Sequence, residues 1–149
     1  MKTLLVAVDN SGVARKVVSL ATEQARALGA SVVVLCCIDR SYALSGPYDI
    51  EAGEDPGDFD MAQDEQNTAE AVVRRALAEL QQAGVNARGR VVAGESAETI
   101  VAQASELGAE MIIIGRRQLS PFNRLLKGSC SASVIERAHC PVLVDVRAD

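Results

Sequence analysis

The residues best suited to chemistry lie between Gly115 and Ser129. An apolar run at residues 111–114 leads straight into this stretch, and a short helical pattern at 131–138 follows it. Backbone N–H groups at the start of a helix lack partners inside the helix, and the helix dipole adds positive charge there. The loop from residue 116 to 127 adds four cations and no acid. This order of strand, basic loop and helix start predicts a phosphate-binding site.

The elements that must hold this loop alternate regularly. Apolar runs predict strands at 4–8, 32–38, 111–114 and 142–146, and a run with Arg88 and Arg90 at alternate positions predicts a further strand at 87–92, near an edge of the sheet. Helical patterns lie between them: one is capped by Asn10 or Ser11 and stops at Gly29, and others cover 61–83, the stretch that Ser96 caps and Gly108 ends, and 131–138. Because a helix follows each strand but the last, the strands should be parallel. The sequence predicts a single domain, residues 1–149, with a three-layer, doubly wound, parallel five-stranded α/β sheet.

The composition predicts which residues fill the core. Aromatic residues make up only 3% of the chain, so Val, Ile, Leu and Ala must do most of the packing, which favours parallel strands under Ala-rich helices. One face of the first helix should be buried, and it carries Val17, Leu20, Ala21 and Leu28. The 61–83 helix has a longer apolar stripe of the same kind, made of Ala69, Val72, Val73, Ala76, Leu77 and Leu80.

Residues 39–60 interrupt the alternation. Glycine and proline punctuate this segment, and six acids and no base lie between residues 49 and 60. A connection of this length without periodicity is either a mobile lid or a disordered insert, and both interpretations stay open.

Charge and apolar content exclude several classes of protein. The net charge of −5 argues against a general nucleic-acid binder. The first apolar run stops at Asp9, which is too early for a signal peptide, and no run is long enough to span a bilayer. The expected location is therefore the cytoplasm.

The four cysteines do not predict a metal site. Cys36 and Cys37 are adjacent in a strand and should point to opposite faces, and no CxxC pair exists. Free thiols fit a reducing compartment. Most simply the cysteines are small core residues, while Cys130 at a helix start is a weaker candidate for redox chemistry. His139 has no nucleophile beside it in the sequence and is not expected to be catalytic.

Five segments, in order along the whole chain, resemble the universal stress protein family. They are Val6-Ala7-Val8-Asp9-Asn10-Ser11, Gly94-x-Ser96-x₃-Ile100, Ile113-Ile114-Gly115, Leu125-Leu126-Lys127-Gly128-Ser129 and Cys140-Pro141-Val142-Leu143-Val144. The resemblance implies the adenine nucleotide alpha hydrolase-like fold with strand order 3-2-1-4-5. It also implies binding of ATP or AMP, with Mg²⁺ on the phosphates, and a part in stress response and signalling.

The resemblance also implies which residues surround the nucleotide. Asp9 would lie by the ribose or adenine, although an Asp before a capped helix is also an ordinary turn residue. Ala7 and Cys37 would line the base. The sugar and phosphates would be surrounded by residues from the later segments, namely Ile114, Gly115, Gln118, Lys127, Gly128, Ser129, Cys130 and Ser131. Ligands of such sheets bind where the strand order reverses, and Asp9 and Gly115 both end strands there.

Gln118 departs from the family pattern. ATP-binding members carry Gly-x₂-Gly-x₉-Gly-Ser/Thr, and this chain keeps the spacing with Gln118 at the second glycine. A left-handed Gln costs about 1–2 kcal/mol, and its side chain takes up room near the phosphates. Its amide could instead donate a hydrogen bond to a phosphate. The alternative is therefore a nucleotide-free, dimeric interaction module of the same fold.

Catalysis is not predicted beyond slow ATP hydrolysis. No residue is an evident general base, and no acidic metal cluster follows a strand. An ATP-pyrophosphatase relative is a poor third interpretation, because Asp9-Asn10-Ser11-Gly12 does not match the phosphate loop of that class.

The last strand predicts a homodimer. In the implied strand order it lies at an edge, and an apolar edge must be paired or shielded. The resemblance implies that two chains pair these edges antiparallel, through Val142, Val144 and Val146.

Overall fold

The computed structural model describes residues 2–9, 15–38, 48–50, 64–115 and 130–147. In these parts of the chain six strands form one sheet: β1 (Thr3–Val8), β2 (Ser31–Ile38), β3 (Tyr48–Ile50), β4 (Ala87–Ala93), β5 (Met111–Gly115) and β6 (Val142–Asp145). The helices described are α1 (Arg15–Leu28), α2 (Asp64–Gln82), α3 (Ser96–Leu107) and α5 (Cys130–Arg137). Each predicted strand and helix is present, with bounds shifted by a few residues.

The five predicted strands are all parallel. The sheet order is β3-β4-β2-β1-β5-β6, so the predicted strands, counted along the chain, stand in the order 3-2-1-4-5. This confirms the doubly wound fold. The strand order reverses between β1 and β5, which lie side by side with Ala7 opposite Ile114.

The sixth strand corrects the interpretation of residues 39–60. β3 pairs antiparallel with β4, with Tyr48 opposite Val91, so this stretch of the segment is regular. Without β3, the outer side of β4 would carry unpaired backbone groups. Three residues are too few to show strand periodicity, so this strand could not be predicted from the sequence. The rest of the segment lies outside the described residues.

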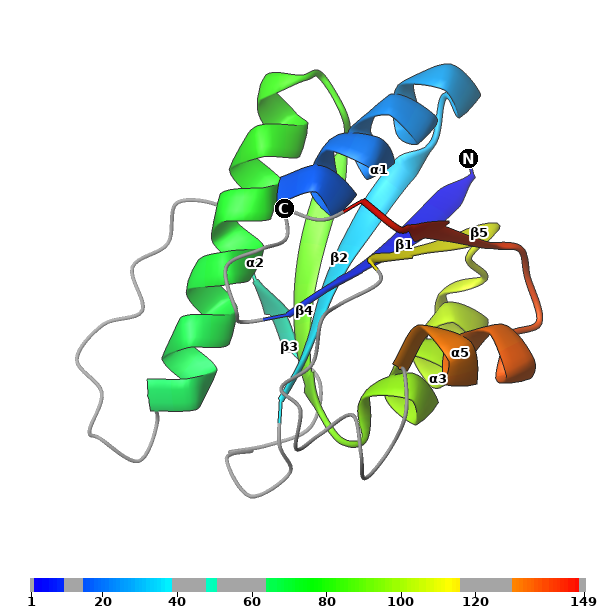
Figure 1. Cartoon of the computed structure of the whole chain (residues 1–149). Helices are drawn as coiled ribbons and strands as arrows, with labels where there is room; N and C mark the ends of the chain where they lie inside the picture. The colour runs from blue at the N-terminus through cyan, green and yellow to red at the C-terminus, as the bar shows by residue number, and fades with distance from the viewer. Residues whose placement is uncertain (1, 10–14, 39–47, 51–63, 116–129, 148–149) are drawn as a thin grey trace.

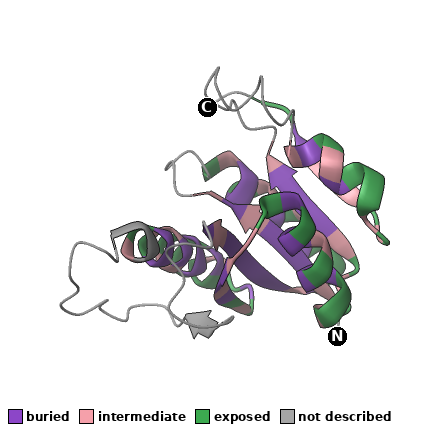
Figure 2. Ribbon diagram, turned by 90° about the horizontal axis from the view of Figure 1, so that it is seen from below, coloured by how far each residue is buried: buried purple, intermediate pink, exposed green. Residues whose placement is uncertain are grey.

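Two helical layers enclose the sheet. Figure 1 shows α1 and α2 on one face, and α3 and α5 on the other. Successive strand residues alternate between two apolar clusters: Leu4 and Val6 pack toward α1 and α2, and Leu5 and Ile112 pack toward α3 and α5. Figure 2 shows the buried residues running along the strands between the helices. As predicted, Cys36 and Cys37 belong to opposite clusters.

The sequence predicted the end of α3 correctly but not the residue that caps its start. Gly108 closes α3 in a left-handed conformation (φ +64°), and its N–H donates to the carbonyls of Ala104 and Ser105. At the other end of α3 the predicted cap, Ser96, is wrong. The preceding residue, Glu95, caps the helix and accepts hydrogen bonds from the N–H groups of Ala97 (3.2 Å) and Glu98 (2.7 Å). A Glu side chain is long enough to reach back over the first turn, which a rule based on short polar caps misses.

One predicted core residue is exposed. In α1, Val17 and Ala21 are buried, but Leu28 is 41% exposed. Leu28 is the last residue of the helix, and Ala25 and Ala30 take the buried positions where the chain turns toward β2. The position of Leu28 at the end of the helix therefore leaves it exposed, although the helical spacing places it on the buried face.

Candidate functional site

The carboxyl ends of the central strands are less covered than the strands themselves. Ala7 lies between buried neighbours in β1, and its register partners Leu35 and Ile114 are also buried, yet Ala7 itself is only partly buried. Cys37, near the end of β2, is likewise partly buried. Asp9 follows β1 directly and is partly exposed. The sheet is thus accessible at the place where its strand order reverses.

Ala7 and Cys37 face α3 and α5. Ala7, Cys37 and Cys130 pack from the edge against the apolar cluster that contains Ile114 and α3. Cys130 begins α5, and the following residue, Ser131, is buried. The structure therefore brings together residues predicted from four separate segments. The set Ala7, Asp9, Cys37 and Cys130 is called the carboxyl-end cluster below.

The Cys37 thiol is held in its neutral form. Burial is the main cause that raises its pKa, and the neighbouring Cys36, Cys130 and Glu95 raise it further. The thiol lies 4.0 Å from the carbonyl of Ser96, toward which it donates. At neutral pH this residue is a small apolar surface rather than a nucleophile.

The packing of α1 on β5 accounts for the glycine at position 115. A Cβ at this position would lie 2.7 Å from Cγ2 of Val17, so α1 can pack on the end of β5 only because residue 115 has no side chain. This missing side chain points toward α1, whereas Ile114 packs on the α3 and α5 side. Any contact of Gly115 with a ligand at the carboxyl-end cluster must therefore come from its backbone.

The remaining predicted contacts fall outside the described residues. They are Gln118, Lys127, Gly128 and Ser129, together with the possible caps Asn10 and Ser11. Their part in a phosphate site stays a prediction.

Asp145 is a buried carboxylate that the sequence analysis missed. It ends β6 opposite Gly115, and only 5% of it is exposed. Its Oδ1 accepts from the backbone N–H (3.0 Å) and Nε (2.9 Å) of Arg147, and its Oδ2 accepts from Nη2 of Arg147 (2.7 Å). These hydrogen bonds lower the pKa of Asp145 to about 2, against the effect of burial, and the charge of Lys16 helps. An acid ending an apolar strand, with Arg two residues later, was the signal available.

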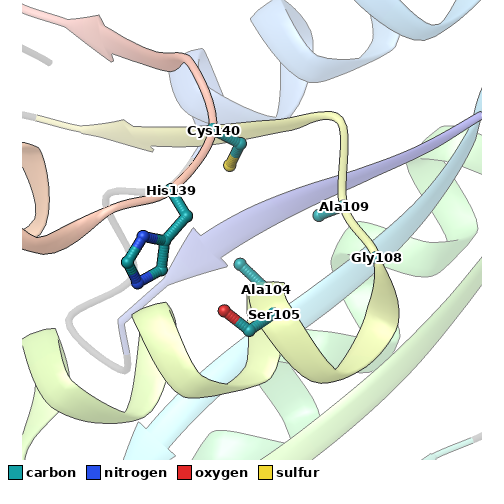
Figure 3. Close-up of a pocket in the computed structure, with 6 residues that line it drawn as sticks. All are labelled: Ala104, Ser105, Gly108, Ala109, His139 and Cys140. Carbon is teal, nitrogen blue, oxygen red and sulfur yellow. The ribbon is translucent and has the colours of Figure 1, made fainter.

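A hollow lies at the other end of the sheet. About 190 Å³ in volume, it is lined by Ala104, Ser105, Gly108, Ala109, His139 and Cys140, which come from the end of α3 and the connection into β6 (Figure 3). We call it the amino-end hollow. Burial raises the pKa of the Cys140 thiol, opposed by a backbone hydrogen bond from Ile112. None of the predicted nucleotide contacts lines it.

The residues that the structure describes contain neither a metal-binding cluster nor a membrane-spanning helix. Among them, no group of three or more His, Cys, Asp and Glu side chains is arranged to hold a metal ion. None of the helices among them is both long and apolar enough to cross a membrane.

Comparison with known proteins gives the family. The model of the universal stress protein family matches residues 1–147. A putative universal stress protein of Staphylococcus haemolyticus is 30% identical over 146 residues, covering 96% of this chain and 83% of its own. The universal stress protein Sll1388 of Synechocystis is 26% identical over 146 residues, covering 95% of each chain.

Solved structures share the fold. A universal stress protein in complex with cAMP superposes with a TM-score of 0.71 at 23% identity, covering 99% of this chain and 98% of its own. The protein from Archaeoglobus fulgidus in complex with dAMP gives 0.67 at 22% identity, with 97% of both chains covered. A family protein from Arabidopsis thaliana with AMP bound gives 0.71 at 17% identity, with 99% and 93% covered. On the family match over nearly its whole length, this chain belongs to the universal stress protein family.

Proposed function

We propose that this chain binds an adenine nucleotide, AMP or ATP, at the carboxyl ends of β1 and β5, and that it acts in stress signalling by binding rather than by turnover. One observation carries the proposal. Ala7, a small residue in the central strand of a sheet, stays partly exposed while Leu35 and Ile114 on either side are buried. In doubly wound sheets ligands bind at this reversal of strand order.

The residues present fit an adenosine. Ala7 and the neutral Cys37 offer a small apolar surface on which a purine can lie. The Asp9 carboxylate can accept hydrogen bonds from ribose hydroxyls or the adenine amine. The described residues offer no metal cluster, so a Mg²⁺ ion would be held chiefly by the phosphates.

Structural neighbours support this ligand class. Proteins of the same fold are described in complex with cAMP, dAMP and AMP. All three ligands share the adenine base and a single phosphate. The base and sugar are therefore the first part of the ligand to test.

The test places a leucine side chain at each end of β1 in turn. Ala7→Leu fills the expected position of the base, and Thr3→Leu places the same side chain at the opposite end of β1, on the same face. Titration calorimetry with AMP should show at least a tenfold weaker affinity for Ala7→Leu and an unchanged affinity for Thr3→Leu. Equal affinities in both variants and the wild type would rule out a base beside Ala7.

Gln118 gives a second test of the same site. If its side chain obstructs the phosphates, Gln118→Gly should strengthen ATP binding by up to about tenfold, equivalent to 1.4 kcal/mol. An unchanged affinity would show that Gln118 does not hinder the nucleotide. The chain contains no Trp and two Tyr, so a co-purifying nucleotide would dominate its absorbance near 260 nm.

A dimeric interaction module without nucleotide is the second candidate. It is favoured by β6, which ends the sheet: Val142 and Val144 are partly exposed there, and the following Val146 is 63% exposed. We propose that two copies pair along β6 in either case. Sedimentation at micromolar concentration should give a dimer, and Val144→Lys should give a monomer. Four free thiols support a cytoplasmic location.

A further inference from the structure

The free side of β6 carries a regular row of backbone groups. The N–H of Ile112 donates to the carbonyl of Pro141 at 2.9 Å, so Pro141 points its carbonyl toward β5. Along a strand, successive residues point their N–H and C=O groups to opposite sides. Val142 and Val144 therefore point theirs away from β5, and Val146 continues the alternation. In the described sheet no strand lies beyond β6, so these groups face outward.

Apolar side chains gather at the same edge. Val142 and Val144 stay partly exposed on the side of α3 and α5, and Val146, just after β6, is 63% exposed. On α5, Ile135 is 56% exposed. An apolar strand edge beside such a side chain is a surface for pairing with another chain.

The position of α5 places Ile135 above this edge. α3 packs over β1 and β2, while α5 packs against α3 and β6 (Figure 1). The side of α5 that faces away from α3 therefore overlooks the free edge of β6. Ile135 lies one turn from the buried Ser131, at the border of the buried face of α5, and α3 leaves it exposed. Ile135 and the valines of β6 thus form one surface.

The partner that this surface fits is a second copy of the chain. In an antiparallel pair, residues that exchange hydrogen bonds stand directly opposite each other and turn their side chains to the same face. An outward-pointing residue of β6 can therefore pair only with an outward-pointing residue of the other strand. β6 of a second copy offers valines at this same spacing, and twofold pairing closes after two chains.

Three registers satisfy this rule, and they bring different residues together. With the twofold axis at Val144, Val144 faces Val144 of the partner subunit and Val142 faces the partner's Val146, so every outward valine is paired. With the axis at Leu143, Val142 faces the partner's Val144, and Val146 lies outside the valine pairs. With the axis at Asp145, the two Asp145 side chains lie directly opposite, which is unfavourable for like charges, and Val142 is left out.

We propose that two copies pair antiparallel along β6 with the twofold axis at Val144, and that Ile135 of both copies extends this interface above the paired strands. The inference rests on the pairing along β6 proposed above and adds its register and a second element. In this arrangement each copy covers the exposed Val146 of the other. Asp145 keeps its hydrogen bonds to Arg147 and lies opposite the partner's Leu143.

Disulfide trapping tests the register. Val144→Cys should form a covalent dimer when oxidised glutathione is added, because directly opposite Cα atoms are about 5.5 Å apart, within the span of a disulfide. Val142→Cys alone should not link to itself, since the two positions are offset along the strands by about 13 Å. Val142→Cys mixed with Val146→Cys should link across the two variants. Mass spectrometry of the linked peptides separates these bonds from any made by the native cysteines.

A matched pair of surface substitutions tests Ile135. Ile135→Glu places a charge in the proposed interface, and Leu28→Glu places the same charge on a side chain that is also exposed (41%), at the end of α1. In sedimentation equilibrium, Ile135→Glu should raise the dissociation constant of the dimer at least tenfold, and Leu28→Glu should change it less than twofold. Both side chains are exposed in the single chain, so the fold should tolerate both changes.

The outcomes separate the register from the dimer itself. Only monomer at micromolar concentration, with no trapping of any variant, would overturn both. Linking of Val144→Cys to Val142→Cys or to Val146→Cys, in place of linking to itself, would keep the dimer and overturn the axis at Val144. Equal dissociation constants for Ile135→Glu and the wild type would remove α5 from the interface.

Discussion

The two ends of the sheet differ in what they offer a ligand. The amino-end hollow has a volume of about 190 Å³ and is lined by small residues together with His139 and Cys140. At the carboxyl-end cluster, Asp9, Cys37 and Ala7 lie near the reversal of strand order, and Asp9 adds a carboxylate that the hollow lacks. The hollow and the topology therefore point to opposite ends, and the topology favours the carboxyl end.

The comparison also separates two uses of small residues. In the amino-end hollow, Gly108 is needed for a left-handed helix end (φ +64°). At the carboxyl end, Gly115 is needed because α1 approaches β5 closely. Helix geometry accounts for Gly108 and packing accounts for Gly115, in both cases without a ligand. A glycine in a binding motif is therefore not by itself evidence that a ligand binds.

The largest expected effect concerns Gly115. Gly115→Ala places a Cβ 2.7 Å from Val17 Cγ2, so the helix or strand must shift, and the free energy of unfolding should fall by about 1–3 kcal/mol. Denaturant unfolding measures this loss. Val17→Ala in the same chain should recover most of it, since the two sites couple directly.

Nucleotide affinity of the same variant sharpens the interpretation. If Gly115→Ala is as stable as the wild type but does not bind AMP, residue 115 must be glycine because of the ligand, and the packing explanation is wrong. If the variant loses stability while the double variant with Val17→Ala binds AMP normally, the glycine serves the approach of α1.

A smaller effect is expected from the pH dependence of Asp145. Its pKa falls from 3.8 to about 2 on folding, so the ion pair with Arg147 stabilises the fold above pH 4 and is lost as the pH falls through 2. Because Arg147 is more than half exposed, we expect about 1–2 kcal/mol rather than the full value of the shift. Asp145→Asn should be less stable than wild type at pH 6, and the gap should narrow steadily as the pH falls from 4 through 2.

The control for this prediction lies at the other end of the sheet. Glu110→Gln removes one negative charge from an exposed residue just before β5. Unfolding by denaturant at a series of pH values compares the two variants. Should both show the same dependence, the change would reflect net charge and not the contact between Asp145 and Arg147.

The sequence predicted the fold well because four of the five parallel strands are nearly continuous apolar runs, β4 with its two arginines being the exception. Val32 to Cys36 are all buried, so the strand is readable without knowing its partners. β3 could not be read, since three residues carry no period and its pairing with β4 is a long-range contact. Glu95 was missed as a cap because its side chain reaches two N–H groups that a shorter cap residue would normally serve.

The site was predictable only in outline. The end of a strand is visible in the sequence, so Asp9 and Gly115 could be assigned to one edge of the sheet, whereas Ala7 and Cys37 were predicted only through the family resemblance. The sequence does not reveal which neighbour requires the glycine at position 115, because the contact between Gly115 and Val17 joins residues about a hundred positions apart. Asp145 was missed for the same reason, since its burial depends on β5 and α1 and not on its neighbours in the chain.

The smallest expected effect tests the choice between the two ends. Ser105→Leu adds bulk to the exposed rim of the amino-end hollow on a residue type that suits a helix, so the fold should tolerate it. We expect its AMP affinity, measured by calorimetry, to stay within twofold of wild type, against the tenfold loss expected for Ala7→Leu. The reverse pattern would place the nucleotide in the amino-end hollow, and the hollow would then be a better guide to the site than strand order. An unchanged affinity in both variants would exclude both ends as the nucleotide site, whereas no AMP binding by the wild type would favour the nucleotide-free interaction module.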